Sequence, residues 1–519
     1  MRARAYKGLL AAITTVSAVT LPGVPATAVV SPTPVPAKGA RSLPVDVLAV
    51  KRHLERFQQI AVANGGTRAA GTPGYDASAE YVAGKLRAAG YKVTLQEFDF
   101  PFFRVIGTPT LALVSPTARS YTPETDFRPM TYSGSGNVTA AVQPVDVVLP
   151  PSAEPSSTSG CEAADYVGFV RGNIALLQRG TCGFRVKAEL AEAAGASGVI
   201  IFNEGQAGTG TSDRRGPLNG SLGDATTHIP VVGTTFAVGQ ELARPGSRAT
   251  LAVTAESDPH RKTRNVIAES RWGDPGRVVM LGSHLDSVLE GPGVNDNGSG
   301  AAAVLETALQ ANAAPTRNRL RFAFWGAEEL GLLGSQHYVT SLSQRERSKI
   351  KLYLNFDMIA SPNHVYGIYD GDDSDHVGAG AGPEGSDKIE KLFETYYATL
   401  GQPYKGTDFT GRSDYGPFIA VGIPAGGLFT GAEGVKSAEE AVTFGGQAGV
   451  AYDRCYHQAC DTLANVNERA LAVNTGAIAT AVAVYAYSPV LPGGSGASAA
   501  TAAPRRMAVV PAWEDSALR

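Results

Sequence analysis

Three apolar runs in the middle of the chain each end in acidic or imidazole side chains. The runs read VVMLGSHLDS, LRFAFWGAEELG and LYLNFDMI. Their length and their largely apolar character predict strands of an open α/β sheet. The polar residues at their ends are His284, Asp286, Glu328, Glu329 and Asp357. Because ligands bind at the carboxyl ends of the strands in an open α/β sheet, we predict a site at this edge.

Helical patterns surround these runs. A helix is predicted to begin after Asp46, which can cap it, and to stop at Asn64. Further helices are expected at about 75–89, 387–400 and 470–487, and a strand at 91–98. Strands that alternate with helices predict an α/β fold in which helices flank the sheet.

Residues 135–255 have a different character, with short strands and many turns. Within them, NIALLQRGTCGFRVKAELAEAAGASGVIIFNE has the pattern of a strand, a turn, a helix and a strand, and HIPVVGTTFAVGQELA repeats the strand-then-helix order. We therefore predict a small α/β domain inserted into a larger unit that consists of residues 43–134 and 256–488. A chain of 519 residues has room for more than one domain of about 150 residues.

The N-terminus has the pattern of an export signal. A basic start is followed by an apolar run from Gly8 to Leu21 and by Ala26-Thr27-Ala28. This combination is typical of a secretory signal peptide, here residues 1–28, and a buried N-terminal helix is the alternative. Residues 29–42 form a Pro-rich leader, and we expect disorder in the tail at 489–519.

Composition argues against two kinds of partner. Hydrophobic residues make up 43% of the chain, the net charge is -3 and the pI is near 6.3. These values show no excess of basic residues of the kind that binds nucleic acid or anionic membranes. After residue 28 the chain has no run of about 18 uninterrupted apolar residues, so no membrane span is predicted. We expect a secreted, extracellular monomer.

The four cysteines fit an oxidising compartment, where an even number usually forms disulfides. Cys455 and Cys460 are close enough to close a tight loop, which leaves Cys161 and Cys182 as the second pair. The alternative, a cysteine-based zinc finger, lacks the CxxC spacing.

Five residues have the chemistry of a two-metal site. Zinc binds His nitrogen and carboxylate oxygen, and two ions about 3.5–4 Å apart need one carboxylate between them and roughly two further ligands each. The candidate ligands are His284, Asp296, Glu329, Asp357 and His457. Asp296 lies in the Gly-rich loop GPGVNDNGSG, between two strand ends, so we predict that it is the bridge. Each residue alone could be a capping or surface residue, but the set as a whole favours a metal site.

Three further residues are candidates for catalysis. Glu328 can act as a general base that takes a proton from water and passes it to the leaving amine. A carboxylate that stabilises a helix N-terminus is the alternative interpretation. Asp286 is placed to bind the other ring nitrogen of His284 and to fix its tautomer. Tyr456 can donate a hydrogen bond to a developing oxyanion.

Together these motifs resemble a known family. HLDS, GVNDNG, AEE, NFDMI, GRSDYGPF and CYHQACD are similar to motifs of the secreted bacterial di-zinc aminopeptidases of metallopeptidase family 28. The similarity covers residues 43–134 and 256–488. It implies an aminopeptidase of the leucyl type and a three-layer zinc-exopeptidase fold, with a mostly parallel central sheet flanked by helices. Residues 135–255 resemble the protease-associated domain, most clearly in RGTCGFRVKA.

The resemblance implies a role for each candidate residue. One zinc is held by His284 and Asp357, and the other by Glu329 and His457. Asp296 bridges the two ions, Glu328 is the general base and Tyr456 is the oxyanion donor. Arg412 and Phe429 line the substrate pocket, which implies a preference for apolar N-terminal side chains. Some relatives bind calcium through carboxylates that follow the CDT segment, and residues 471–476 contain none, so the resemblance does not extend to calcium.

Other functions remain open at this stage. A carboxypeptidase, a dipeptidase or a one-zinc glutaminyl cyclase could share the fold. A binding protein without catalysis should have lost a ligand or the base, and none is missing. The chain contains neither GxSxG, which a serine hydrolase needs, nor HExxH, which a thermolysin-like endopeptidase needs. We therefore expect a secreted zinc aminopeptidase that acts on the N-termini of peptides or proteins.

Overall fold

The computed structural model describes residues 43–493, apart from 208–212, 224 and 379. The predicted signal peptide and leader lie outside the described residues, and so does the predicted tail from residue 494 onwards. Residues 489–493 of that tail are described and packed, since Leu491 is buried in the core and the Gly493 N–H donates to the Lys351 carbonyl. The packed chain therefore continues beyond the predicted end of the globular unit at residue 488.

The first of two eight-stranded sheets contains the three apolar runs. Its strands, in spatial order, are β1 (Lys92–Val105), β10 (Ala255–Glu269), β12 (Asn318–Trp325), β11 (Asp274–His284), β13 (Ile350–Phe356), β16 (Ala425–Phe429), β14 (Gly367–Tyr369) and β15 (Lys405–Thr407). The four central strands, β12, β11, β13 and β16, are mutually parallel, so their carboxyl ends lie at one edge. The predicted α/β fold with a mostly parallel central sheet is confirmed.

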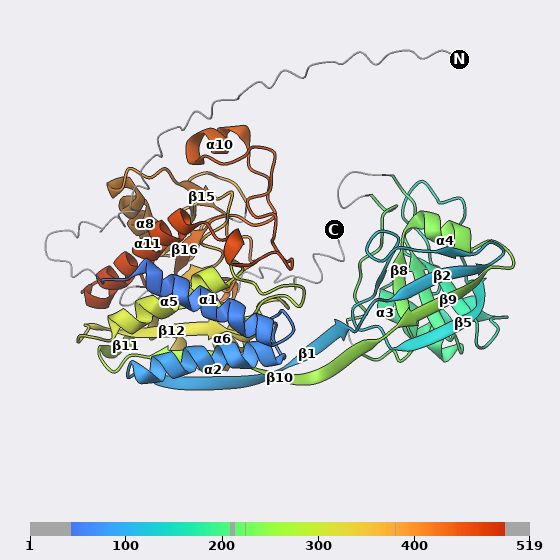
Figure 1. Ribbon diagram of the computed structural model, residues 1–519, viewed down its shortest axis with the longest axis horizontal. Coiled ribbons are helices and arrows are strands. Elements are labelled where there is room, and N and C mark those ends of the chain that lie inside the picture. Colours follow the sequence, from blue (N-terminus) through green and yellow to red (C-terminus); the bar gives the residue numbers. More distant parts are fainter. Residues whose placement is uncertain (1–42, 208–212, 224, 379, 494–519) are drawn as a thin grey trace, which may run out of the picture. The chain divides into compact units, whose positions relative to one another are not determined.

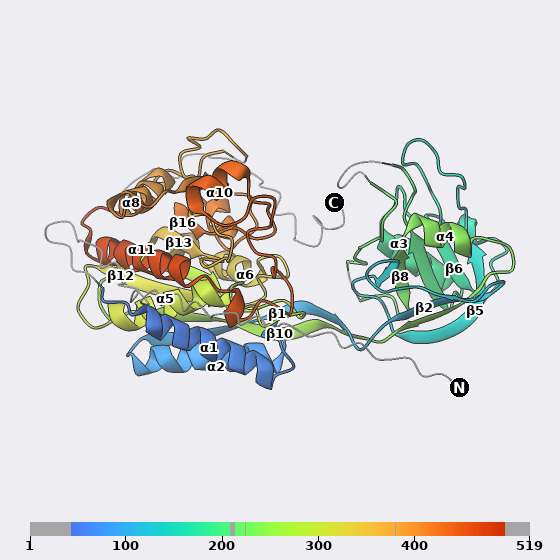
Figure 2. The ribbon, with the colours of Figure 1, turned by 45° about the horizontal axis from the view of Figure 1, so that its top comes forward.

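Helices cover both faces of this sheet, which gives three layers (Figures 1 and 2). Side chains of β11 alternate between the two faces, with Val279 and Leu281 in one core and Val278 and Met280 in the other. The first core also contains residues of α1 (Val47–Ala63), α2 (Pro73–Ala88), α5 (Gly298–Ala311), α8 (Ser386–Thr399) and α11 (Glu468–Tyr487). The second contains residues of α6 (Leu333–Ser341) and α9 (Gly416–Ala420). The remaining helices of this unit are α7 (Gln344–Arg347), α10 (Ala438–Phe444) and the short η3 (Leu463–Asn465).

Two of these helices follow directly from the sequence pattern. In α1 the Asp46 carboxylate accepts the Leu48 N–H as the predicted cap, and the predicted apolar positions from Val50 to Ala61 are buried. Helix α11 alone, among the described residues, is long and apolar enough to cross a membrane. It lies in the first core, where its Ala, Val and Ile side chains are buried against α5 and α8. Its apolar character is therefore explained by packing inside the protein.

The second sheet also has eight strands. In spatial order they are β3 (Arg119–Ser120), β2 (Thr110–Ser115), β9 (Arg248–Val253), β5 (Gly136–Pro144), β6 (Ile174–Gln178), β7 (Gly198–Phe202), β8 (Val231–Thr234) and β4 (Phe127–Pro129). Among its described residues, the helices of this unit are η1 (Ala163–Tyr166), α3 (Phe184–Ala193) and α4 (Phe236–Leu242). The predicted strand, helix and strand correspond to β6, α3 and β7, and β6 and β7 are parallel. A disulfide joins Cys161 to Cys182 beside this motif.

The second unit begins earlier in the chain than the sequence indicated. Strands β2, β3 and β4 precede residue 135, but β2 pairs with β9 and β4 pairs with β8. Leu111 and Leu113 of β2 lie in the same core as Leu251 of β9. The boundary predicted at residue 135 therefore falls inside this sheet, because local patterning does not reveal a pairing partner so far along the chain.

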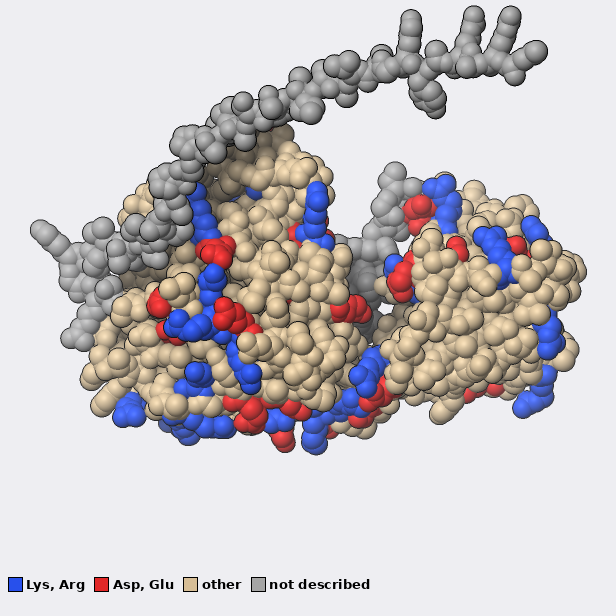
Figure 3. Space-filling model, viewed as in Figure 1, with Lys and Arg blue, Asp and Glu red and all other residues tan. Residues whose placement is uncertain are grey.

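A ribbon of two paired strands links the two units: the chain leaves the first unit in β1 and returns to it in β10. Opposite charges face each other directly across the ladder, as in Asp99 with Lys262 at 3.1 Å and Arg104 with Glu256 at 2.6 Å. Figure 3 shows acidic and basic side chains intermixed along this ribbon. Each such cross-strand pair contributes about 0.2–1 kcal/mol. These pairs stabilise a strand pair that is longer than the predicted strand at 91–98.

The ribbon supplies a test of whether the first unit folds by itself. Val105 and Ala255 are paired across β1 and β10, so the chain leaves and returns at one point. We predict that replacing residues 106–254 by Asn-Gly, which favours a tight hairpin turn, leaves a folded protein, because both cores of the first unit lie outside this segment. Thermal unfolding followed by near-ultraviolet circular dichroism measures this. A Pro-Pro linker is the matched control that disfavours the turn, and loss of a cooperative transition in the Asn-Gly protein would show that the first unit depends on the second.

Candidate active site

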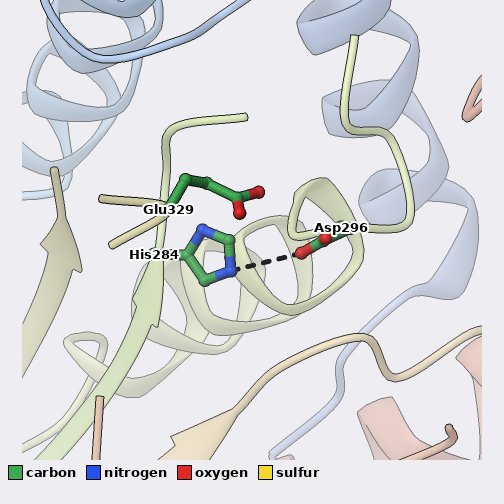
Figure 4. Close-up of side chains that lie close together, drawn as sticks. All are labelled: His284, Asp296 and Glu329. Carbon is green, nitrogen blue, oxygen red and sulfur yellow. Dashed lines mark ion pairs between the residues drawn. The ribbon is translucent and has the colours of Figure 1, made fainter. Parts of the chain in front are cut away.

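The predicted ligands gather at the carboxyl edge of the first sheet. His284 is the last residue of β11, Asp357 follows β13, and Asp296 lies in the loop before α5. Glu329 follows β12, and His457 comes from the loop between α10 and η3. Figure 4 shows three of these side chains, His284, Asp296 and Glu329, which reach towards a common point from separate segments. The structure therefore brings the five residues together.

The five side chains form two groups that share Asp296. Oδ1 of Asp296 lies 3.3 Å from His284 Nε2, which is also 3.3 Å from Oδ1 of Asp357. Oδ2 of Asp296 lies 3.2 Å from His457 Nε2, which is 2.9 Å from Oε2 of Glu329. The two oxygens of a single carboxylate thus face different imidazoles, which is the arrangement expected of a bridging ligand.

These side chains fit a pair of divalent cations. Ligand atoms at about 2.0–2.2 Å from a tetrahedral zinc lie about 3.3–3.6 Å from one another, close to the separations observed here. Oε1 of Glu329 is buried and has no hydrogen-bond partner among the described residues. A buried carboxylate oxygen without a donor is costly unless a cation binds it. Oxygen and imidazole ligands of this kind are those that zinc prefers.

Glu328 lies next to these groups but farther from the imidazoles. Its Oε2 is 3.9 Å from His284 Nε2, and its side chain lines the same pocket. Burial raises the pKa of Glu328 well above its usual value, and the nearby His284 offsets only part of this effect. Burial also raises the pKa of Glu329 to about 7. Glu328 is therefore a carboxyl group that can hold and release a proton beside the ligand set.

Asp286 makes different contacts from those predicted. Its backbone carbonyl, rather than its carboxylate, lies 3.1 Å from His284 Nδ1, and the nearest carboxylate oxygen is 3.8 Å away. The carboxylate instead accepts the backbone N–H groups of Glu328 at 3.2 Å and Glu329 at 3.4 Å. The peptide after His284 turns back towards the imidazole, which leaves the side chain free to reach the next strand end. Asp286 thus contacts both strand ends, through two different groups.

The backbone near the ligands adopts unusual conformations. Ala327, Met358 and His457 have φ values of 57°, 48° and 56°. Residues other than glycine seldom have positive φ, and each such residue costs on the order of 1–3 kcal/mol. Two of them adjoin Glu328 and Asp357, and the third is itself a candidate ligand. The surrounding contacts must therefore hold this strained backbone in place.

A pocket opens from the cluster of candidate ligands, and its lining includes Tyr456, Arg412 and Phe429. The ring of Tyr456 stacks on His457, with ring centroids 3.8 Å apart. Arg412 Nη2 donates to the Tyr456 hydroxyl at 3.3 Å, and Nη1 forms an ion pair with Glu433 at 2.7 Å. The loop that carries Tyr456 and His457 is closed by the disulfide between Cys455 and Cys460.

Several residues that contact the candidate ligands or their loops were not predicted from the sequence. Ser413 Oγ donates to Asp357 Oδ2 at 2.5 Å, and Asp414 next to it is fully buried, so that burial raises its pKa to about 8. Both lie within GRSDYGPF, so the motif itself was the available signal. Asp461 lies at the end of CYHQACD and accepts the Asp296 N–H. Arg68, which donates to carbonyls of the Asp296 loop, had no recognisable signal in the sequence.

The comparisons agree with this geometry. Residues 265–482 match Peptidase family M28, and residues 142–242 match the PA domain. An aminopeptidase of Pseudomonas aeruginosa is 50% identical over 432 residues, which cover 83% of this chain and 79% of that protein. The chain belongs to peptidase family M28. This confirms the family resemblance and the inserted PA domain inferred from the motifs.

Two further relatives of the family are informative. A protein of Aspergillus fumigatus described as a probable leucine aminopeptidase 2 is 46% identical over 370 residues, 70% of each chain. The solved structure of a zinc aminopeptidase from Bacillus subtilis has a TM-score of 0.56 and 25% sequence identity, and covers 85% of this chain and 95% of that chain. As a member of the family, this protein is a zinc-dependent exopeptidase.

The cluster predicts how metal affects stability. A ligand that binds only the folded state adds about 2.7 kcal/mol when its free concentration is 100 times its Kd. We expect zinc to raise the Tm of chelator-treated protein. The rise should be smaller in His457→Ala, because one of the two groups of candidate ligands then lacks its imidazole. Thermal unfolding with and without zinc measures both shifts.

His228→Ala is the control for this experiment. His228 belongs to the second unit, and its side chain is 84% exposed. Zinc should stabilise this variant as much as the wild type. Equal zinc shifts in all three proteins would argue against His457 as a ligand.

Proposed function

We propose that the protein is a secreted di-zinc aminopeptidase that removes leucine-like or other apolar residues from the N-termini of peptides. The observation that carries the proposal is the division of the Asp296 carboxylate between two imidazoles, His284 and His457, with a buried carboxyl group, Glu328, beside them. The names of the fungal and Bacillus subtilis relatives support both leucine as a substrate residue and zinc as the metal.

Each zinc has its own ligands in this proposal. His284 and Asp357 hold one ion, Glu329 and His457 hold the other, and Asp296 bridges them. The distances of 2.9–3.3 Å among these side chains support the assignment. When bound, zinc polarises the scissile carbonyl and lowers the pKa of water at the site.

The remaining chemistry is assigned to side chains of the protein. Glu328 Oε2 takes a proton from the attacking water and delivers it to the leaving amine. The Tyr456 hydroxyl donates a hydrogen bond to the oxyanion that develops on the carbonyl. Arg412 donates to the Tyr456 oxygen, so the phenolic hydrogen is free to point into the pocket. Asp286 holds the backbone of Glu328 and so aims the base.

The pocket supports recognition of the peptide N-terminus. The pocket is lined by acidic side chains, so it attracts a positively charged α-ammonium group. Phe429, with Met358 and Tyr369, supplies apolar surface for the N-terminal side chain. An acylated N-terminus has no charge and loses this attraction. This arrangement favours exopeptidase action at the amino end.

A carboxypeptidase is less compatible with the pocket. Such an enzyme needs a free cation for the α-carboxylate of its substrate. Among the described residues that line the pocket, Arg412 is the only lysine or arginine, and Glu433 already pairs with it.

Export is supported by the two disulfides, which persist in oxidising compartments.

The direct test compares two leucyl substrates that differ only in their amine. Chelator-treated protein is assayed before and after addition of zinc, with one substrate carrying a free α-amine and the other an N-acetyl group. We predict zinc-dependent cleavage of the free-amine substrate alone. Cleavage of both would indicate that the α-amine is not recognised, and cleavage of neither by zinc-loaded protein would contradict the proposal.

The assignment of the base makes a second prediction. Glu328→Gln keeps the shape of the side chain but cannot accept the proton, so kcat should fall by about 100- to 10,000-fold while both zinc ions stay bound. Steady-state kinetics and metal analysis of the same sample measure the two quantities. Glu468→Gln, at an exposed ion pair with Lys51, is the control and should keep the wild-type rate. Near-normal turnover by Glu328→Gln would mean that another group is the base.

A further inference from the structure

One residue holds three successive backbone N–H groups of the loop that carries Asp296. The Asp461 carbonyl accepts from Val294 at 3.1 Å, and its Oδ1 and Oδ2 accept from Asn295 and Asp296, each at 2.9 Å. Asp461 is only 2% exposed. Both carboxylate oxygens of Asp461 therefore serve as acceptors for this loop. The backbone of Asp296 is therefore fixed by a side chain from another segment.

That other segment carries His457. Asp461 directly follows Cys460, which closes the small disulfide loop around His457. Asn465 in turn restrains Asp461, since its Nδ2 donates to Asp461 Oδ1 at 3.1 Å and also to both oxygens of Asp453. Asp461 thus links two loops that are far apart in the sequence but supply the two atoms, Asp296 Oδ2 and His457 Nε2, that lie 3.2 Å apart.

The carbonyl groups of the Asp296 loop face a charge of the opposite sign. The guanidinium of Arg68 is fully buried and donates to the carbonyls of Pro292 at 2.8 Å, Gly293 at 2.5 Å and Leu285. Arg68 also lies over the ring of Phe57, 5.0 Å from its centroid, which restrains the guanidinium. The loop thus has an anion at its N–H groups and a cation at its carbonyl groups.

We propose that Asp461 and Arg68 are positioning residues that set the Asp296 carboxylate between His284 and His457. This inference rests on the two-metal function proposed above and extends it to residues that touch neither substrate nor metal. The Asp461 oxygens are engaged by the N–H groups of residues 295 and 296 and by Asn465, so Asp461 acts through the main chain. A misplacement of about 1 Å at a reacting site can cost about 100-fold in rate, so fixing this loop has a large effect.

The test is Asp461→Asn, which keeps the shape but places an amide N–H₂ against one backbone N–H. Loss of a residue that orients a metal ligand typically weakens metal binding by about 10- to 100-fold. We expect zinc affinity to fall in that range when chelated protein competes with a chromophoric chelator. At saturating zinc, kcat should also fall while KM changes little, because Asp461 is not among the residues that line the pocket.

A matched control separates positioning from general stability. Glu204 in the second unit is buried, and its Oε1 accepts the successive N–H groups of Ser156 at 2.8 Å and Ser157 at 2.9 Å. Glu204→Gln likewise removes a buried carboxylate that binds successive backbone N–H groups, here together with its ion pair to Arg214, and none of its contacts is shared with the candidate ligands. Zinc affinity and kcat should therefore stay within about 2-fold of wild type, since sites without shared partners behave independently. An equal loss of zinc affinity in this control would overturn the positioning role.

The remaining outcomes are also decisive. If Asp461→Asn binds zinc as tightly as wild type and keeps its kcat, the inference is wrong. If Asp461→Asn does not fold, Arg68→Lys replaces it, because lysine keeps the charge but cannot span three carbonyls, and unchanged zinc affinity there would equally refute the inference. Wild-type protein that fails to bind two zinc ions or to cleave the free-amine substrate would refute the proposed function itself, whatever the variants do.

Discussion

Four carboxylates and two imidazoles share a largely buried space at the carboxyl edge of the first sheet, and the electrostatic cost of that arrangement constrains everything around it. Asp296, Glu328, Glu329 and Asp357 repel one another in a region where water screens them poorly. The effective penalty for burying an ion is several kcal/mol unless an opposite charge compensates it. Zinc bound at this edge would supply that compensation and would couple metal binding to the integrity of the edge.

The scaffold around the cluster binds main-chain groups more than ligand side chains. Asp286 accepts the N–H groups of Glu328 and Glu329, and Asp461 and Arg68 hold the two sides of the Asp296 loop. Fixing the backbone in this way leaves the ligand oxygens free for metal. One of the residues with positive φ, Ala327, directly precedes Glu328, whose N–H group Asp286 accepts.

The inserted unit leaves this architecture intact because the chain leaves and re-enters the first unit at two residues that are paired with each other. Its chain begins after Val105 and returns at Ala255, which are neighbours in the β1 and β10 ladder. All five proposed ligands and Glu328 come after this segment. A domain added at such a point does not interrupt the parallel strands that build the site, and the PA match at residues 142–242 lies entirely within it.

The sequence by itself determined the strands that end in candidate ligands, the helix capped by Asp46 and the family. These features are encoded locally, in unbroken apolar runs, a cap and motifs of fixed order. Only the tertiary structure decided that β2 to β4 belong to the second sheet and that Asp286 faces His284 through its carbonyl. It alone showed that Arg68 and Asp461 hold the Asp296 loop from opposite sides. The physical reason is that strand pairing, rotamers and contacts to distant backbone depend on which segments meet in space, and a single residue such as Arg68 carries no local pattern that specifies its partner.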